Sequence, residues 1–112
     1  MSLFSFFKKN PLKQKILAIK EDIEVTVSKV CDEKSWVDWY GAYDIDPQYL
    51  VFWICVMSDD MKQKLKSDAE LNAILKNIPS KHGYPAKVKN IDFESQETVD
   101  RESNGNWYQH FK

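Results

Sequence analysis

Five carboxylates lie within eleven residues near the end of the chain, interrupted by a single basic residue, Arg101. They are Asp92, Glu94, Glu97, Asp100 and Glu102. A negative surface of this kind steers a basic partner toward the protein and fixes its orientation. Trp107 follows closely and is of the residue type that most often dominates a binding interface. We therefore predict a partner-binding surface at these six residues, with solvated surface charge as the competing interpretation.

The other reactive side chains form no recognisable catalytic set. His82 and His110 are far apart in the sequence and have no cysteine or histidine at the spacing of zinc ligands. Cys31 and Cys55 form no CxxC pair, and Cys55 lies in an apolar run where a thiol packs as a small hydrophobe. The glycines are isolated, which excludes the glycine-rich phosphate-binding loops. We expect no enzyme activity, no metal site and no cofactor.

A second hypothesis is a small-molecule site, or the cleft of a minor enzyme, beside the turn at 44–48. Asp44 and Asp46 lie two residues apart near a strand end, which suits a carboxylate pair for acid–base chemistry. Arg101 and His110 from the C-terminal segment would supply further polar groups. The competing interpretation is that the two aspartates shape a proline turn.

Tryptophan and tyrosine side chains are frequent in the middle of the chain. Among them are Trp36, Trp39, Tyr40, Tyr43 and Trp53. Such residues can line a ligand pocket, although core packing accounts for most of them in a small domain. Those left exposed would serve as contact residues. A third hypothesis follows, in which two copies form a homodimer through these aromatics or through an exposed strand edge.

Acidic and basic residues nearly balance. Sixteen basic and seventeen acidic residues give a formal net charge of −1. Nucleic-acid binders usually carry a basic excess, so we expect no nucleic-acid partner. No stretch approaches the roughly 18–20 apolar residues of a membrane span, and the first ten residues lack an apolar segment of signal-peptide length. We expect a cytoplasmic protein that does not bind a membrane.

The first element that must position these groups is a helix over residues 11–30. Its apolar positions recur at steps of three or four: Leu12, Ile16, Ile19, Ile23, Val27 and Val30. Asn10 is a good N-cap, and Pro11 is tolerated at the first helical position. The alternation within 23–27 also fits a strand, but the longer stripe favours a helix.

Two strands follow. Period-two alternation predicts one over 37–44, and the uncharged run 49–57 predicts a central strand covered on both faces. A helix over 59–78 comes next. We expect it to break near Ser67, because Ser67 and Glu70 form a capping box and the apolar stripe changes direction there.

The C-terminal third contains a strand, a short helix and an aromatic end. The strand is predicted over 86–94, with a β-bulge near Lys89 where the alternation changes phase. Ser95 is a suitable cap for the helix, and Gly105 would end it. The segment 106–111 is aromatic and is expected to dock on the domain.

These elements predict one α+β domain over residues 1–112. The order is α-β-β-α-β with a C-terminal aromatic segment, and a small mixed sheet packs against the helices. The second and third strands, joined through a helix, should be connected by a crossover. Residues 1–9 precede the first helix and are expected to be flexible.

Two segments resemble small uncharacterised bacterial cytosolic proteins, some of them immunity-like. The first is Trp39-Tyr-Gly-Ala-Tyr-Asp-Ile-Asp-Pro47, and the second runs from Glu94 through Gly105-Asn-Trp107. The resemblance covers about half the chain and carries over no functional residue. It implies a bacterial, cytoplasmic protein that binds another protein, such as a toxin.

Overall fold

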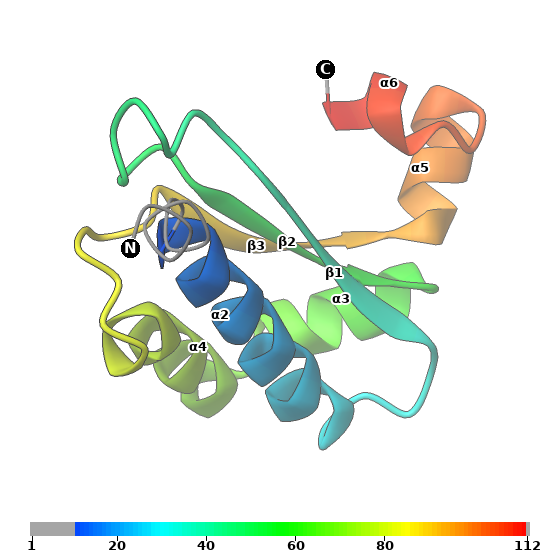
Figure 1. Cartoon of the computed structure of the whole chain (residues 1–112). Helices are drawn as coiled ribbons and strands as arrows, with labels where there is room; N and C mark the ends of the chain where they lie inside the picture. The colour runs from blue at the N-terminus through cyan, green and yellow to red at the C-terminus, as the bar shows by residue number, and fades with distance from the viewer. Residues whose placement is uncertain (1–10, 112) are drawn as a thin grey trace, which may run out of the picture.

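The computed structural model describes residues 11–111. Its elements are α2 (Pro11–Ser28), β1 (Ser35–Tyr40), β2 (Val51–Val56), α3 (Asp59–Lys66), α4 (Ala69–Lys81), β3 (Asn90–Ser95), α5 (Gln96–Ser103) and α6 (Trp107–Phe111). The predicted α+β class and element order are confirmed, and the aromatic end forms α6 (Figure 1). The expectation for residues 1–9 lies outside the described residues.

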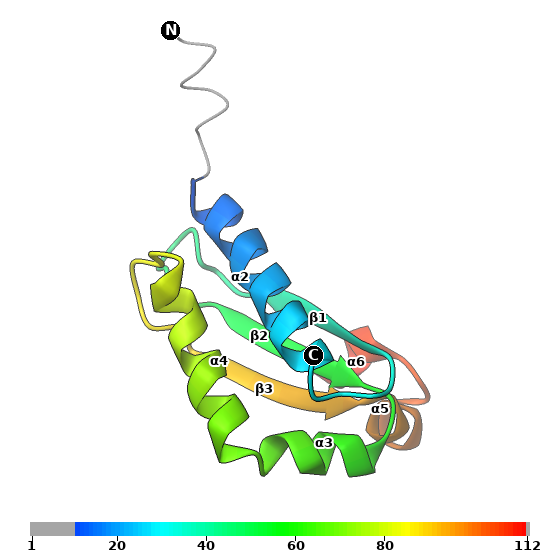
Figure 2. The ribbon, with the colours of Figure 1, turned by 90° about the horizontal axis from the view of Figure 1, so that it is seen from below.

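A three-stranded mixed sheet in the order β1-β2-β3 organises the molecule. β1 pairs antiparallel with β2, and β3 pairs parallel with β2 after the crossover through α3 and α4. β2 is therefore the central strand, as predicted. The helices α2, α3 and α4 cover one face of the sheet, while α5 and α6 lie beyond its other face at one end (Figures 1 and 2).

The face toward α2, α3 and α4 carries the core and is called the core face. Its strand residues, which the register places on one side, are Val37, Phe52, Ile54, Val56 and Phe93, all buried. The stripe on α2 packs against them through Ile16, Ile19, Ile23 and Val27. Since α2 is continuous through 23–27, the helical interpretation of that segment is confirmed.

The opposite side is called the open face. Period-two alternation and the register place on it Trp36, Asp38, Tyr40, Val51, Trp53, Cys55, Asn90, Asp92 and Glu94. Only its end toward α5 and α6 is covered, so Trp53 is half-buried whereas Cys55 is buried. The expectation that the central strand is covered on both faces therefore holds for part of its length.

The predicted break between the two middle helices is confirmed, but its cap is a different residue. α3 ends at Lys66 with Ser67 as its C-cap. Asp68 caps α4, and its carboxylate accepts a hydrogen bond from the amide of Leu71 at 2.9 Å. The predicted capping box at Ser67 is wrong, because Ser67 is the C-cap of the preceding helix.

Two strand boundaries also differ from the sequence prediction. β1 ends at Tyr40 instead of residue 44, because Gly41 adopts a φ of +133°. A β-carbon at Gly41 would lie 2.1 Å from the Tyr49 carbonyl oxygen. Only glycine therefore fits where the backbone of residue 41 approaches the backbone of residue 49. The prediction of a β-bulge near Lys89 is wrong, because β3 begins at Asn90 and pairs with β2 in regular register. Across residues 11–111, no helix combines the length and the apolar character needed to cross a membrane.

Candidate functional site

The C-terminal unit, defined as α5 and α6 together, turns back over the open face. Ser95 caps α5, and its hydroxyl accepts from the amide of Thr98 at 3.1 Å, as the sequence predicts. Asn104 ends α5 in the left-handed conformation, and the amide of Gly105 bonds to the carbonyl of Val99 at 3.1 Å. This reversal allows α6 to approach the sheet.

Aromatic contacts hold α6 on the open face. Phe111 stacks on Trp53 with ring centres 4.6 Å apart, and Trp107 meets Trp36 edge-on at 5.3 Å. The indole nitrogen of Trp107 also donates to the side-chain oxygen of Gln96 on α5 at 2.9 Å. The predicted docking of the aromatic end is therefore confirmed.

A cavity remains between β1 and α6 and is called the aromatic cavity. It has a volume of about 420 Å³ and is lined by Asp38, Trp39, Tyr40, Trp107, Tyr108 and Phe111. Tyr40 is 43% exposed and Tyr108 is 78% exposed, so the cavity opens to solvent. The Asp38 carboxylate is exposed and has no hydrogen bond or ion pair to any group within residues 11–111. Segments distant in sequence thus form one aromatic and acidic surface.

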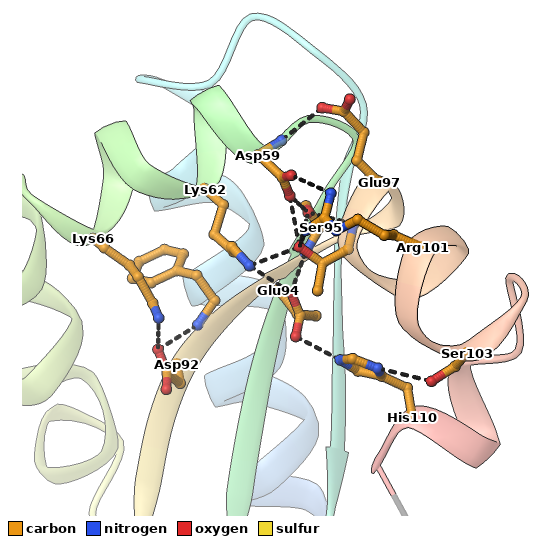
Figure 3. A network of polar contacts seen from close by, with 12 residues as sticks. Asp59, Lys62, Lys66, Asp92, Glu94, Ser95, Glu97, Arg101, Ser103 and His110 are labelled. Carbon is orange, nitrogen blue, oxygen red and sulfur yellow. Dashed lines mark hydrogen bonds and ion pairs between the residues drawn. The ribbon is translucent and has the colours of Figure 1, made fainter.

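Glu94 lies at the centre of a polar network beneath α6 (Figure 3). Its Oε1 accepts from Lys62 Nζ at 2.9 Å, and its Oε2 accepts from His110 Nε2 at 2.7 Å. Burial opposes the charged form of Glu94, but the bonds from Lys62, His110 and the Ser95 amide outweigh it and lower the pKa of this carboxyl. Glu94 therefore ties α3, β3 and α6 together.

Asp92 occupies the same face of β3 as Glu94 and also meets a lysine of α3. Lys66 Nζ lies 3.7 Å from Asp92 Oδ1. Lys62 and Lys66 are one helical turn apart on α3, which matches the two-residue spacing of Glu94 and Asp92 along the edge strand. Both carboxylates are thus paired within the molecule.

Glu97 and Arg101 belong to a second network at the start of α3 (Figure 3). Asp59 accepts from the hydroxyls of Ser95 and Thr98 and from Arg101 Nη1, the last at 3.0 Å. Together these donors hold the pKa of Asp59 well below its usual range. One oxygen of Glu97 accepts from the Asp59 amide at 2.8 Å. This network fastens α5 to α3.

Asp100 and Glu102 are the predicted site residues that face solvent with least internal restraint. Asp100 accepts from the side chain of Gln96 one turn earlier at 2.8 Å, and Glu102 is exposed. The six predicted residues therefore separate into three groups. Asp92, Glu94 and Glu97 make internal contacts, Asp100 and Glu102 face solvent, and Trp107 lines the aromatic cavity.

Ser103, His110 and Glu94 form a chain with the composition of a catalytic triad. Ser103 Oγ lies 3.1 Å from His110 Nδ1, and Glu94 engages the other ring nitrogen. Ser103 is, however, the last residue of α5, where the negative end of the helix dipole opposes an alkoxide. The two amides that follow it already donate to the carbonyl of Val99 and offer no oxyanion site. We interpret the chain as a structural tie.

The polar groups of the small-molecule hypothesis do not line the aromatic cavity. Asp46 accepts from the backbone and side-chain amides of Gln48, each at 3.1 Å, and so shapes the turn. Arg101 is bound to Asp59 and His110 to Glu94. Within the described chain, no hydrogen bond or ion pair joins any two of the four groups of that hypothesis.

The cysteines and a cavity beside α4 suggest no further chemistry. Cys31 donates to the carbonyl of Glu33 at 3.3 Å, and burial raises the pKa of the Cys55 thiol above its usual range. Within residues 11–111, no three His, Cys, Asp or Glu side chains gather closely enough to hold a metal ion. A cavity of about 650 Å³ beside α4 has twelve lining residues, among them the exposed Lys76, Lys87 and Lys89 and the apolar Ala86, Val88 and Ile91.

Sequence reasoning missed Asp38, Tyr108 and Phe111 as site residues. The alternation over 37–44 puts Asp38 and Tyr40 on one strand face, but does not show that this face meets α6. Comparison of the chain with protein-family models, with curated proteins and with solved structures found no match in any of the three.

Proposed function

We propose that the protein is a non-enzymatic interaction module that binds a basic protein partner through the aromatic cavity and the exposed carboxylates of α5. The observation that carries this proposal is the solvent-open aromatic cavity of about 420 Å³ with an unpaired carboxylate at its wall. Tyrosine and tryptophan at a surface bury large areas on binding at low cost in conformational entropy.

Charge at the C-terminal unit supports a basic partner. Residues 90–112 contain five acidic and two basic residues, and the sixth predicted group, Trp107, reaches the cavity wall. Asp100 and Glu102 face solvent on α5, so their field is available to an approaching molecule. Such rim charges act chiefly on association rate and orientation, while the aromatic groups provide the buried contact.

An immunity-type role, in which the basic partner is a toxin, is one form of this proposal. A toxin gene directly beside the gene for this chain would favour it. Self-association through the same aromatic surface is the alternative, and light scattering of the purified chain distinguishes a homodimer from a monomer that is free to bind another protein.

Capture of a partner protein from cell lysate on the immobilised 112-residue chain tests the proposal. The variant combines Asp100→Asn with Glu102→Gln, and the matched control combines Asp32→Asn with Asp44→Asn at exposed positions away from the C-terminal unit. We expect a basic protein to be retained by the wild type and the control, to be reduced several-fold on the variant, and to be released by salt. Equal retention by the two double variants, or retention of no basic protein, would contradict the proposal.

A further inference from the structure

The walls of the aromatic cavity favour a cation. Within the described chain, Asp38 is the charged residue among its lining groups, and the other five are aromatic. Trp39 alternates onto the core face, so the rings that belong to the open face and to α6 are those of Tyr40, Trp107, Tyr108 and Phe111. The face of an aromatic ring is negative and attracts an ammonium or guanidinium group, while its apolar surface packs against an aliphatic stem. A carboxylate and several ring faces around one volume therefore suit a cation carried on a hydrocarbon chain.

The carboxylates on the open face differ in whether a lysine of the chain pairs with them. This face carries three carboxylates, Asp38, Asp92 and Glu94. Lys62 lies 2.9 Å from Glu94 and Lys66 lies 3.7 Å from Asp92. Asp38 alone of the three has no lysine within residues 11–111. A lysine supplied from outside would complete the pattern.

The same aromatic cluster already contacts one lysine of the chain. Lys34 Nζ lies 5.6 Å from the ring centre of Trp36, within the range of a cation–π interaction. Trp36 is in turn in edge contact with Trp107, which forms part of the cavity wall. An aromatic ring of this cluster thus already accepts a lysine ammonium.

We propose that the aromatic cavity receives a lysine side chain of the partner, with its ammonium group paired to Asp38 and its stem packed against Trp107 and Tyr108. This inference rests on the proposed function and specifies the group that the site recognises. The ion pair and the ring contacts are each expected to change affinity by a few-fold, because the cavity is open to solvent.

Titration of the ¹⁵N-labelled full chain with short peptides tests this inference. The probe is an N-acetylated, C-amidated Gly-Lys-Gly peptide, and the neutral comparison replaces lysine by norleucine. We expect the lysine peptide to shift the indole signal of Trp107 and the amides of 38–40 with a Kd in the millimolar range, roughly −4 kcal/mol. The norleucine peptide should leave these signals nearly unchanged.

Variants separate the cavity from general surface charge. Asp38→Asn and Tyr108→Ala should each weaken the lysine peptide by about two- to fivefold. Asp44→Asn and Tyr49→Ala, which change an exposed carboxylate and an exposed tyrosine elsewhere, should not. Equal shifts by the norleucine peptide, unchanged affinity in Asp38→Asn, or tighter binding of an arginine peptide would overturn the assignment of lysine.

Failure of this inference differs from failure of the proposed function. Capture of a basic protein that depends on Asp100 and Glu102, without lysine binding at the cavity, would leave the interaction module in place and remove the lysine pocket. Lysine binding without capture of any basic protein would contradict the proposed interaction module. It would also contradict the inference that the lysine belongs to a protein partner.

Discussion

The two faces of the sheet differ in composition although they are built from the same three strands. The core face presents valine, isoleucine and phenylalanine to three helices and is buried. The open face presents tryptophan, tyrosine and carboxylates, and two short helices cover one end of it. Folding requires the first kind of surface, because buried apolar area is its main driving force. The second kind retains polar groups that water already satisfies, so folding does not require it to be covered, and it is the surface at which we propose that a partner binds.

A matched pair of phenylalanine substitutions tests this difference most strongly. Phe52 is fully buried on the core face, whereas Phe111 is half-buried against Trp53 on the open face. We expect Phe52→Ala to lower the free energy of unfolding by about 3–5 kcal/mol, because it leaves a cavity in the core. Phe111→Ala should lower it by about 1–2 kcal/mol, chiefly through the lost ring contact. Urea unfolding followed by circular dichroism measures both.

A similar loss in the free energy of unfolding in the two variants would contradict the conclusion that the core face, and not the open face, provides most of the stability. The slope of the free energy of unfolding against urea concentration is the control, since a changed slope signals an altered unfolded or native state and not a simple loss of stability.

A second pair of variants compares the carboxylates on β3. The side chain of Glu94 is 12% exposed and is bonded to Lys62 and His110. The side chain of Asp92 is 36% exposed, and its one ion pair within residues 11–111 is with Lys66. Glu94→Gln should cost about 1–3 kcal/mol, because it leaves the Lys62 ammonium without its charged partner. Asp92→Asn should cost less than about 1 kcal/mol, as surface pairs usually do. Equal costs would show that Glu94 does not anchor the open face.

The lowered pKa of Glu94 makes stability depend on pH in a stated direction. A carboxyl whose pKa is lower in the folded than in the unfolded state stabilises the fold above the unfolded value and loses that contribution as pH falls through the folded value. The wild type should therefore lose more stability than Glu94→Gln between about pH 6 and pH 3. Parallel curves from urea unfolding at several pH values would contradict this. Other acids, including Asp22 and Glu33, also have lowered pKa values and should set the slope that remains in the variant.

The elements with the strongest local signals were the ones that the sequence predicted. The stripe on α2, the helix break near residue 67, the cap at Ser95 and the uncharged central strand all appear in the structure. The errors concern single residues at the boundaries of elements. Gly41 ends β1 because Tyr49 approaches it, and the phase change near Lys89 falls at the start of β3 instead of inside it.

The candidate site was harder to predict because pairing across the fold decides which charges remain exposed. Glu94 resembles its neighbours in sequence, yet a lysine of α3 and a histidine of α6 engage it. Asp38 has no sequence signal of its own, because it is a single aspartate within a strand. Its role depends on the return of α6 over the open face, which no local pattern reveals.

The Asp38→Asn variant tests most directly whether the open face is a binding surface, because Asp38 has no internal ion pair or hydrogen bond within residues 11–111. Its free energy of unfolding and its affinity for the lysine peptide should be measured on the same preparation. We expect the free energy of unfolding to stay within about 0.5 kcal/mol of the wild type, as for most surface changes, while affinity for the peptide falls. Reduced stability with unchanged affinity would contradict the account, because Asp38 would then support the fold and not a partner.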